Sequence, residues 1–328
     1  MPRIFEPQTV LPEHVVTAAD LPAIGSSWLS DDSEAQEKYL RIAQRSGVRT
    51  RRFILPYEEI LQLQGLQYRA EQFEKFGTAM LVEAIEKAIA THQLEPEDIG
   101  ALVFSSCSVP TIPAIDAAAI LRSSLSSRIS RVPIYQHGCA GGVIGMGLGA
   151  KLASLGKPVI VASVELCSMV FQPENHCGAH LVGAGIFADG AAATVLTPEE
   201  VGPLVLKASQ SYLIPESRHL MGYDIFDDGF HLRLDRKLPQ VLVEECPNAI
   251  LEFLSRDRLA ANDINYWLFH PGGIKILEFL RETLEISQES CHWAYDVLRE
   301  HGNLSSATIH YVLKAFMQDA VIKPGERA

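Results

Sequence analysis

One cysteine stands where a thiol could act as a nucleophile. Cys139 follows the apolar run Val132 to Tyr135 and precedes Ala140-Gly141-Gly142, which opens an Ala- and Gly-rich helical segment. This pattern places Cys139 near the N-terminus of a helix, where unpaired N–H groups and the helix dipole favour negative charge. A thiolate, the reactive form of cysteine, is therefore expected to form more easily there than in water. The small neighbours also allow backbone N–H groups to stabilise an oxyanion.

A histidine and an asparagine stand at comparable places further along the chain. His270 ends the apolar segment Tyr266–Phe269 and precedes Pro271-Gly272-Gly273, which suits the carboxyl edge of a sheet, where α/β enzymes build sites. Asn303 comes just ahead of a predicted helix. Each residue also has a structural explanation: Cys139 as a buried thiol, Asn303 as a helix N-cap, and His270 as one of 11 histidines.

Together the three residue types describe a particular chemistry. A cysteine nucleophile needs a base or an ion-pair partner, and histidine commonly fills that role. A histidine and an asparagine amide can both donate hydrogen bonds to one carbonyl oxygen, which stabilises the enolate formed when a malonyl thioester loses CO2. Decarboxylative carbon–carbon bond formation needs such a pair, whereas hydrolysis does not. Cys139, His270 and Asn303 are therefore the candidate catalytic residues.

Helical and strand patterns alternate along most of the chain, which predicts an α/β fold. The turn signal Glu95-Pro96-Glu97-Asp98 separates an amphipathic helix from a short buried strand. Helices are expected at Phe73–His92, Gln240–Ser255, Ile274–Thr283 and Ser305–Asp319, and strands at Ala101–Phe104, Val132–Tyr135, Val159–Ser163, Ala192–Leu196, Leu204–Ala208 and Tyr266–Phe269.

A weak internal repeat relates the two halves of the chain. LEPEDIGALVFSS from Leu94 parallels LAANDINYWLFHP from Leu259, and His137-Gly138-Cys139 parallels His301-Gly302-Asn303 at almost the same spacing. A chance match of short motifs is the alternative. The repeat predicts halves 1–200 and 201–328 that share one core, with Cys139 and Asn303 at equivalent helix N-termini facing each other across a pseudo-twofold axis.

Composition limits the classes of partner. The chain has 328 residues, 47% of them hydrophobic, and a net charge of -12, which argues against nucleic acid as a partner. No apolar run is long enough to span a membrane, and no signal peptide is evident, so a cytoplasmic protein is expected. The six cysteines are scattered without metal-ligand spacing, and neither a disulfide framework nor a metal site is predicted.

Five segments in order resemble the chalcone and stilbene synthase-like type III polyketide synthases, and most closely the bacterial members. They are GCAGG around Cys139, LVGAGIFADGAAA from Leu181, GFHLRLDRKLP from Gly229, FHPGG from Phe269 and GNLSSAT from Gly302. The resemblance implies a thiolase-like αβαβα layered fold with two pseudo-duplicated halves. It also implies that Cys139 carries the acyl group and that His270 and Asn303 orient and polarise the malonyl thioester.

The resemblance assigns binding residues as well. Phe187 and Phe230 match the two gatekeeper phenylalanines between the CoA tunnel and the elongation cavity. Cys107, Cys167 and Val170 match positions that line the cavity, and Cys167 stands where plant members commonly carry threonine, which argues against a phenylpropanoid starter. Lys38, Arg41 and Arg45 share one face at helical spacing and match basic residues that hold CoA phosphates; a solvated surface face is the alternative.

The implied activity is extension of an acyl-CoA starter by malonyl-CoA, followed by cyclisation to a pyrone, resorcinol or related aromatic product. A homodimer without a metal or redox cofactor is expected. The alternatives are a ketoacyl synthase III-like enzyme, which takes malonyl groups from a carrier protein, and a non-catalytic thiolase-fold subunit. The final segment, Lys323 to Ala328, is expected to lead in relatives into a last strand and a Gly-Phe-Gly-Pro-Gly loop that the printed sequence lacks.

Overall fold

The core of the molecule is a seven-stranded mixed sheet. The computed structural model describes residues 1–63, 65–198 and 202–328. The sheet runs β6-β5-β7-β8-β1-β9, with β2 paired to β8, and β5 is parallel to both β6 and β7. The strands are β1 (Arg3–Ile4), β2 (Gln8–Val10), β5 (Ala101–Ser106), β6 (Ser130–Tyr135), β7 (Val159–Leu166), β8 (Asp189–Thr197) and β9 (Leu204–Val205). Every residue of β5, β7 and β8 is buried, as their apolar composition requires.

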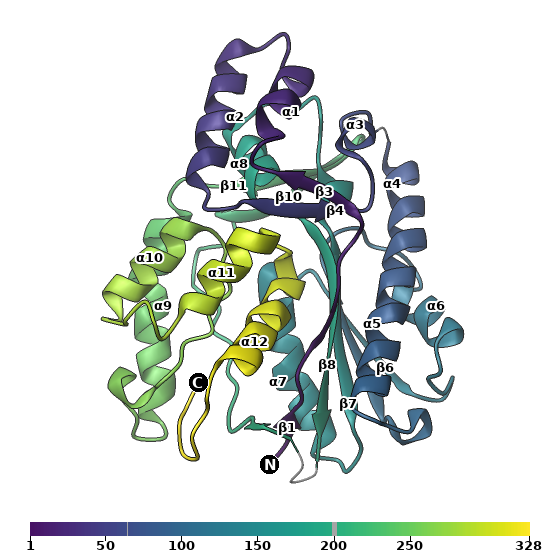
Figure 1. Ribbon diagram of the computed structural model, residues 1–328, viewed down its shortest axis with the longest axis vertical. Helices are drawn as coiled ribbons and strands as arrows, with labels where there is room; N and C mark the ends of the chain where they lie inside the picture. The colour runs from purple at the N-terminus through teal and green to yellow at the C-terminus, as the bar shows by residue number, and fades with distance from the viewer. Residues whose placement is uncertain (64, 199–201) are drawn as a thin grey trace.

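Helices cover both faces of this sheet in layers (Figure 1). On one face α5 packs on β7 and β8, and α6 packs beside α5. On the other face α7 and α12 pack on the sheet and on each other, and α11, α10 and α9 follow outside them. The bounds are α5 (Thr78–Thr91), α6 (Ile115–Arg122), α7 (Gly141–Ala153), α9 (Leu238–Ser255), α10 (Ile274–Thr283), α11 (His292–His301) and α12 (Thr308–Asp319).

Smaller elements gather at one end of the layers, at the top of Figure 1. Two antiparallel ribbons lie there, together with helices of which α2 packs on α8 and α8 packs on β11. They are α1 (Leu21–Trp28), α2 (Ser33–Arg45), α3 (Tyr57–Ile60), α4 (Leu66–Gln72), α8 (Gly178–Ile186), β3 (His14–Thr17), β4 (Thr50–Phe53), β10 (Met221–Phe226) and β11 (Gly229–Leu234). Short helical turns occur throughout the chain: η1 (Phe73–Gly77), η2 (Pro96–Asp98), η3 (Gly138–Ala140), η4 (Cys167–Val170), η5 (Ala261–Asp263) and η6 (Ser305–Ala307).

Most expected elements are confirmed, and one strand is wrong. The segment 266–269 is not a strand, because its backbone amides do not bond to a neighbouring strand. Instead, Tyr266 N–H donates to Arg327 O and Trp267 N–H donates to Ser290 O, which lie in two separate segments. The strand expected at Leu204–Ala208 ends at Val205. The helix expected at Phe73–His92 begins with a π-helical turn before α5.

The repeat is visible in the helices that follow the two matched tripeptides. Cys139 lies in the 3₁₀ turn η3, which leads into α7, and Asn303 precedes the 3₁₀ turn η6, which leads into α12. The two turns pack against each other, as do the two helices. Among the described residues, the parallel pairs of strands, β5 with β6 and β5 with β7, all lie in the first half. Segment 266–269 of the second half has no partner strand. No helix among the described residues is long and apolar enough to cross a bilayer.

Candidate active site

A large cavity opens beside Cys139. Its volume is about 650 Å3, and its wall is formed by η3, η4, α8, the β10–β11 hairpin and the N-terminal elements from β3 to α3. Most lining side chains are aliphatic or aromatic, and none of those in the described chain is a carboxylate. Such a surface suits an uncharged organic chain better than a polar metabolite.

Cys139 is held by a tight approach of two backbone segments. The residues before it, Gln136 and Gly138, have positive φ values of 66° and 56°, so the chain turns sharply between β6 and η3. A Cβ atom on Gly142 would lie 2.3 Å from the backbone oxygen of Ser306, and one on Gly141 would lie 2.4 Å from Ser105 Oγ. Glycine at these two positions therefore allows the start of α7 to approach β5 at Ser105 and η6 at Ser306.

Asn303 is fixed beside the same cysteine. It is 1% exposed, and its backbone bonds on both sides to the segment that carries Phe187: Asn303 N–H donates to Ile186 O at 2.8 Å, and Ala188 N–H donates to Asn303 O at 3.0 Å. Its side-chain Oδ1 accepts the N–H of Ser305 at 2.8 Å. With Oδ1 engaged, the amide NH2 of Asn303 remains the group available to neighbours.

The thiol of Cys139 is protonated at neutral pH. The pKa of this thiol is raised to about 11, because burial, together with the charge of Glu165, outweighs the hydrogen bonds from Ser305 and Asn303, which lower it. The expectation of an easily formed thiolate at a helix N-terminus is thus wrong for the free protein, because desolvation outweighs the favourable turn. The free nucleophile is a thiol that must lose its proton during reaction.

His270 is a neutral imidazole without a partner. Both ring nitrogens are buried and make no hydrogen bond in the described part of the chain. Burial lowers the pKa of His270 to about 4. His270 does not line the cavity, and no hydrogen bond joins it to Cys139 or Asn303 among the described residues. The structure therefore brings Cys139 and Asn303 together, and the convergence of His270 with them stays a prediction.

All five residues assigned to the cavity by resemblance line it: Phe187, Phe230, Cys107, Cys167 and Val170. The basic cluster lies elsewhere. Lys38, Arg41 and Arg45 project from α2, where Arg41 is exposed and pairs with Glu37 at 3.8 Å.

The opposite face of α2 contributes the buried Tyr39 to the cavity wall. The basic face of α2 and the cavity are therefore on two sides of one helix.

Two polar residues of the site escaped the sequence analysis. Ser305, with a φ of 49°, lines the cavity and lies close to both Cys139 and Cys107. Glu165 is completely buried and accepts hydrogen bonds from Ser108 Oγ at 2.6 Å, from the Cys107 N–H and from Ser306 Oγ. Burial raises its pKa, and these donors lower it. Only the motif context GNLSSAT pointed to Ser305.

The site contains no evident metal centre. No group of three or more histidine, cysteine or carboxylate side chains is arranged to hold an ion in the ranges 1–63, 65–198 and 202–328.

Comparison with known proteins places this geometry in a family. Residues 5–199 match the N-terminal domain model of chalcone and stilbene synthases, and residues 205–328 match the C-terminal domain model. A 1,3,6,8-tetrahydroxynaphthalene synthase of Streptomyces peucetius subsp. caesius is 31% identical over 315 residues, which are 93% of this chain and 83% of that protein. A phloroglucinol synthase of Pseudomonas fluorescens is 27% identical over 94% of this chain and 89% of its own.

Solved structures agree with this assignment. The crystal structure of 1,3,6,8-tetrahydroxynaphthalene synthase from Streptomyces coelicolor A3(2), a bacterial type III polyketide synthase, matches with a TM-score of 0.93 at 26% identity, covering 98% of this chain and 92% of that one. A type III pentaketide synthase from Neurospora crassa matches with a TM-score of 0.87 at 26% identity, covering 99% and 93%. The fold is thus thiolase-like. The chain belongs to the chalcone and stilbene synthase family and is an acyl-transferring enzyme of the type III polyketide synthase class.

Proposed function

We propose that the chain extends an acyl-CoA starter with malonyl-CoA while the acyl group is carried on Cys139. The observation that carries the proposal is that the Cys139 thiol, which lines a largely apolar cavity, is a hydrogen-bond partner of the Asn303 carboxamide from a distant segment. The Cys139 thiol attacks the starter thioester, CoA leaves as a thiol, and the acyl chain occupies the cavity. Halves 1–200 and 201–328 supply Cys139 and Asn303 respectively.

His270 is proposed to act first as a base. A neutral imidazole can accept the thiol proton as the Cys139 sulfur attacks, and the lowered pKa of about 4 keeps His270 in that neutral form at physiological pH. The mechanism requires His270 to reach Cys139 when the substrate is bound.

Asn303 and His270 are proposed to hold the extender thioester. The free NH2 of Asn303 and a ring N–H of His270 donate to its carbonyl oxygen, so that loss of CO2 leaves a stabilised enolate. The enolate carbon then attacks the Cys139 thioester, the carbon–carbon bond forms, and the thiolate leaves. Transfer of the longer chain back to Cys139 starts the next extension.

The cavity is proposed to set chain length and cyclisation. Relatives include a phloroglucinol synthase and a 1,3,6,8-tetrahydroxynaphthalene synthase, and one named for alpha-pyrone synthesis comes from Mycobacterium tuberculosis. A pyrone, a resorcinol or a related aromatic is accordingly the proposed product of this chain. Phe187 and Phe230 are proposed to separate the CoA path from the cavity, since both lie on its wall.

CoA is proposed to bind along α2. Lys38, Arg41 and Arg45 lie three and four residues apart, so their cationic groups share one helix face. The Nζ of Lys38 lies close to Gly178 at the start of α8, since a Cβ atom on Gly178 would be 3.3 Å from that Nζ. In a chain with a net charge of -12, this basic face is a local exception that would attract phosphates.

A homodimer is proposed to form at the β6 edge. This strand ends the sheet and is mostly accessible, and the flanking segments expose apolar side chains at Ile112, Leu121 and Val143. An open strand edge with exposed apolar neighbours is a surface that a second copy would cover.

Incubation with a panel of acyl-CoAs and either malonyl-CoA or a malonyl-carrier protein tests the proposed function. The expected result is a series of products, seen by mass spectrometry, that depends on malonyl-CoA. Products from the carrier protein alone would support a ketoacyl synthase III-like enzyme, and no products with either extender would support the non-catalytic subunit.

A further inference from the structure

His180 is a cavity residue to which neither the proposed mechanism nor the sequence gave a role. It lies in α8, is 3% exposed, and contributes to the cavity wall. Its Nε2 is buried and has no hydrogen-bond partner in the described part of the chain. Buried polar groups are almost always paired, so an unpaired imidazole nitrogen on a cavity wall calls for an explanation.

Two other polar side chains on the same wall, Arg51 and Trp28, are already engaged by backbone oxygens. Arg51 donates to the backbone oxygens of Ala184 and Phe187 at 2.6 and 3.0 Å. Trp28 Nε1 donates to Pro173 O at 2.6 Å. These side chains serve the fold, whereas His180 retains hydrogen-bonding capacity that the fold does not use.

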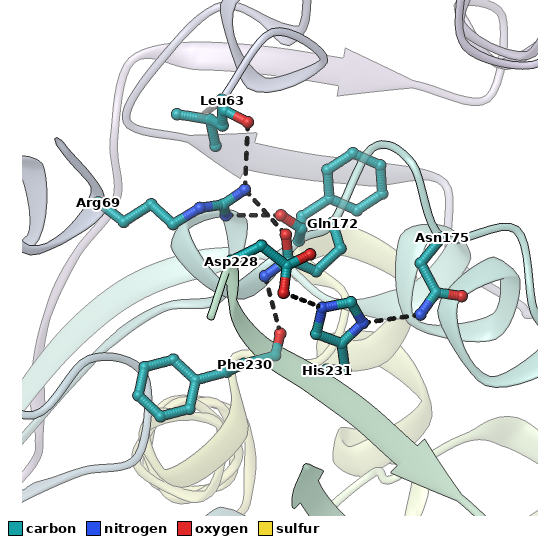
Figure 2. A network of polar contacts seen from close by, with 8 residues as sticks. Leu63, Arg69, Gln172, Asn175, Asp228, Phe230 and His231 are labelled. Atoms are coloured by element: carbon teal, nitrogen blue, oxygen red, sulfur yellow. Dashed lines mark hydrogen bonds and ion pairs between the residues drawn. The ribbon is translucent and has the colours of Figure 1, made fainter. Parts of the chain in front are cut away.

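A second histidine, His231, packs beside the imidazole of His180. The rings of His180 and His231 are 5.5 Å apart and tilted by 58°. His231 bonds to Asn175 Nδ2 through Nδ1 and to Asp228 Oδ1 through Nε2, both at 2.9 Å (Figure 2). His231 is thus fixed at both ring nitrogens beside His180.

His180 is also placed near a gatekeeper. His180 lies in the first turn of α8, Phe187 follows the last residue of that helix, and both side chains line the cavity. Gly183 lies between them in the sequence and leaves space for the side chains of Leu232 and Phe187. A Cβ atom on Gly183 would lie 2.9 Å from Leu232 and 3.4 Å from the Phe187 ring. His180 therefore belongs to the wall that a chain must pass beside Phe187.

The imidazole is uncharged at physiological pH. Burial lowers the pKa of His180 to about 4, with a smaller contribution from His231. A neutral imidazole carries one N–H donor and one acceptor nitrogen. It would therefore favour a neutral oxygen over an anionic carboxylate or phosphate.

We propose that His180 is a substrate-positioning residue that donates a hydrogen bond to a keto oxygen of the growing chain in the cavity. The inference rests on the proposed function, which supplies a ligand with carbonyl groups at alternate carbons. In a largely apolar chamber, a donor at a fixed place distinguishes a chain with an oxygen at the right carbon from a saturated chain of equal length.

Binding of matched thioesters tests the inference without turnover. In a Cys139→Ala background, which blocks acylation, calorimetry compares hexanoyl-CoA with 3-oxohexanoyl-CoA and 5-oxohexanoyl-CoA. We expect at least one keto ligand to bind about threefold to tenfold more tightly than hexanoyl-CoA, which is the contribution of one neutral hydrogen bond. His180→Phe should remove that preference and leave hexanoyl-CoA affinity within about twofold of the parent.

Two controls keep the result decisive. His219→Phe changes an exposed histidine that does not line the cavity and should retain the preference. A thermal melt shows whether His180→Phe remains folded. If the phenylalanine ring does not fit, His180→Leu replaces it as the test variant. Equal binding of all three ligands to the parent, or a preference that survives the loss of His180, would overturn the inference. Because binding is measured without turnover, either result leaves the product assay of the proposed function unaffected.

Discussion

The hydroxyl of Ser305 lies 3.2 Å from the Sγ of Cys107 and is also a hydrogen-bond partner of Cys139. Its backbone N–H is held by Asn303 Oδ1, so the position of the hydroxyl is set by the same residue that flanks the nucleophile. A serine that the sequence analysis did not single out thus becomes a link between two thiols and a carboxamide. Its effect on Cys139 can be measured directly.

Ser305→Ala is expected to make Cys139 less acidic. The Ser305 hydroxyl lowers the pKa of the Cys139 thiol by stabilising the thiolate, so its removal moves that pKa upward. The rate of alkylation of Cys139 by iodoacetamide, followed by peptide mass spectrometry against pH, should shift to higher pH. Ser217→Ala, at a distant turn, should leave the profile unchanged. An unchanged or lower-pH profile for Ser305→Ala would contradict this assignment.

Asn303→Ala is expected to separate the two half-reactions. Loss of one donor to the enolate oxygen should slow malonyl-CoA decarboxylation by about a hundredfold or more, as removal of an oxyanion donor does elsewhere. Acylation of Cys139 by the starter should fall much less. Release of CO2 from labelled malonyl-CoA and the mass of the protein measure the two steps. Equal losses in both steps would instead indicate that Asn303 mainly supports the local fold.

Gly142→Ala is expected to destabilise the protein by about 3 kcal/mol, because an added Cβ would lie 2.3 Å from a backbone oxygen that cannot move cheaply. Gly273→Ala is the matched control, since nothing lies within 4 Å of its Cβ position. Urea unfolding followed by circular dichroism gives both free energies of unfolding. If the two variants were equally stable, the close contact between α7 and η6 would not be as the structure has it.

Val170→Trp is expected to shorten the products. Val170 lines the cavity of about 650 Å3, and a larger side chain there leaves less room for the growing chain. Leu155→Trp, at a residue that is 82% exposed and does not line the cavity, should leave the product masses unchanged. Mass spectrometry of products from one starter compares the three proteins. Products of full length from Val170→Trp would show that this part of the wall does not limit extension.

The strands of the first half were predictable because each one is marked by a short apolar run in the sequence. Runs such as Val159–Ala162 are apolar throughout, which is typical of a strand buried on both faces. The matched tripeptides around Cys139 and Asn303 also predicted that two helix starts would meet, as η3 and η6 do.

Non-local features could not be predicted in the same way. Segment 266–269 has the composition of a strand, but a strand needs a paired neighbour, and its amides find single carbonyls of Arg327 and Ser290. The pKa of Cys139 depends on how much water the assembled site excludes, which the Gly-rich motif does not indicate. His180 carries no motif of its own, and its unpaired nitrogen becomes evident only from the packed wall.

Whether Cys139 carries the acyl group is the central question, and mass spectrometry of the protein after incubation with an acyl-CoA answers it most directly. The predicted result is one acyl adduct, located by peptide mapping at Cys139 and lost in Cys139→Ala, which still contains Cys107 and Cys167 on the same cavity wall. An adduct on either of those cysteines, or products formed by Cys139→Ala, would contradict the account.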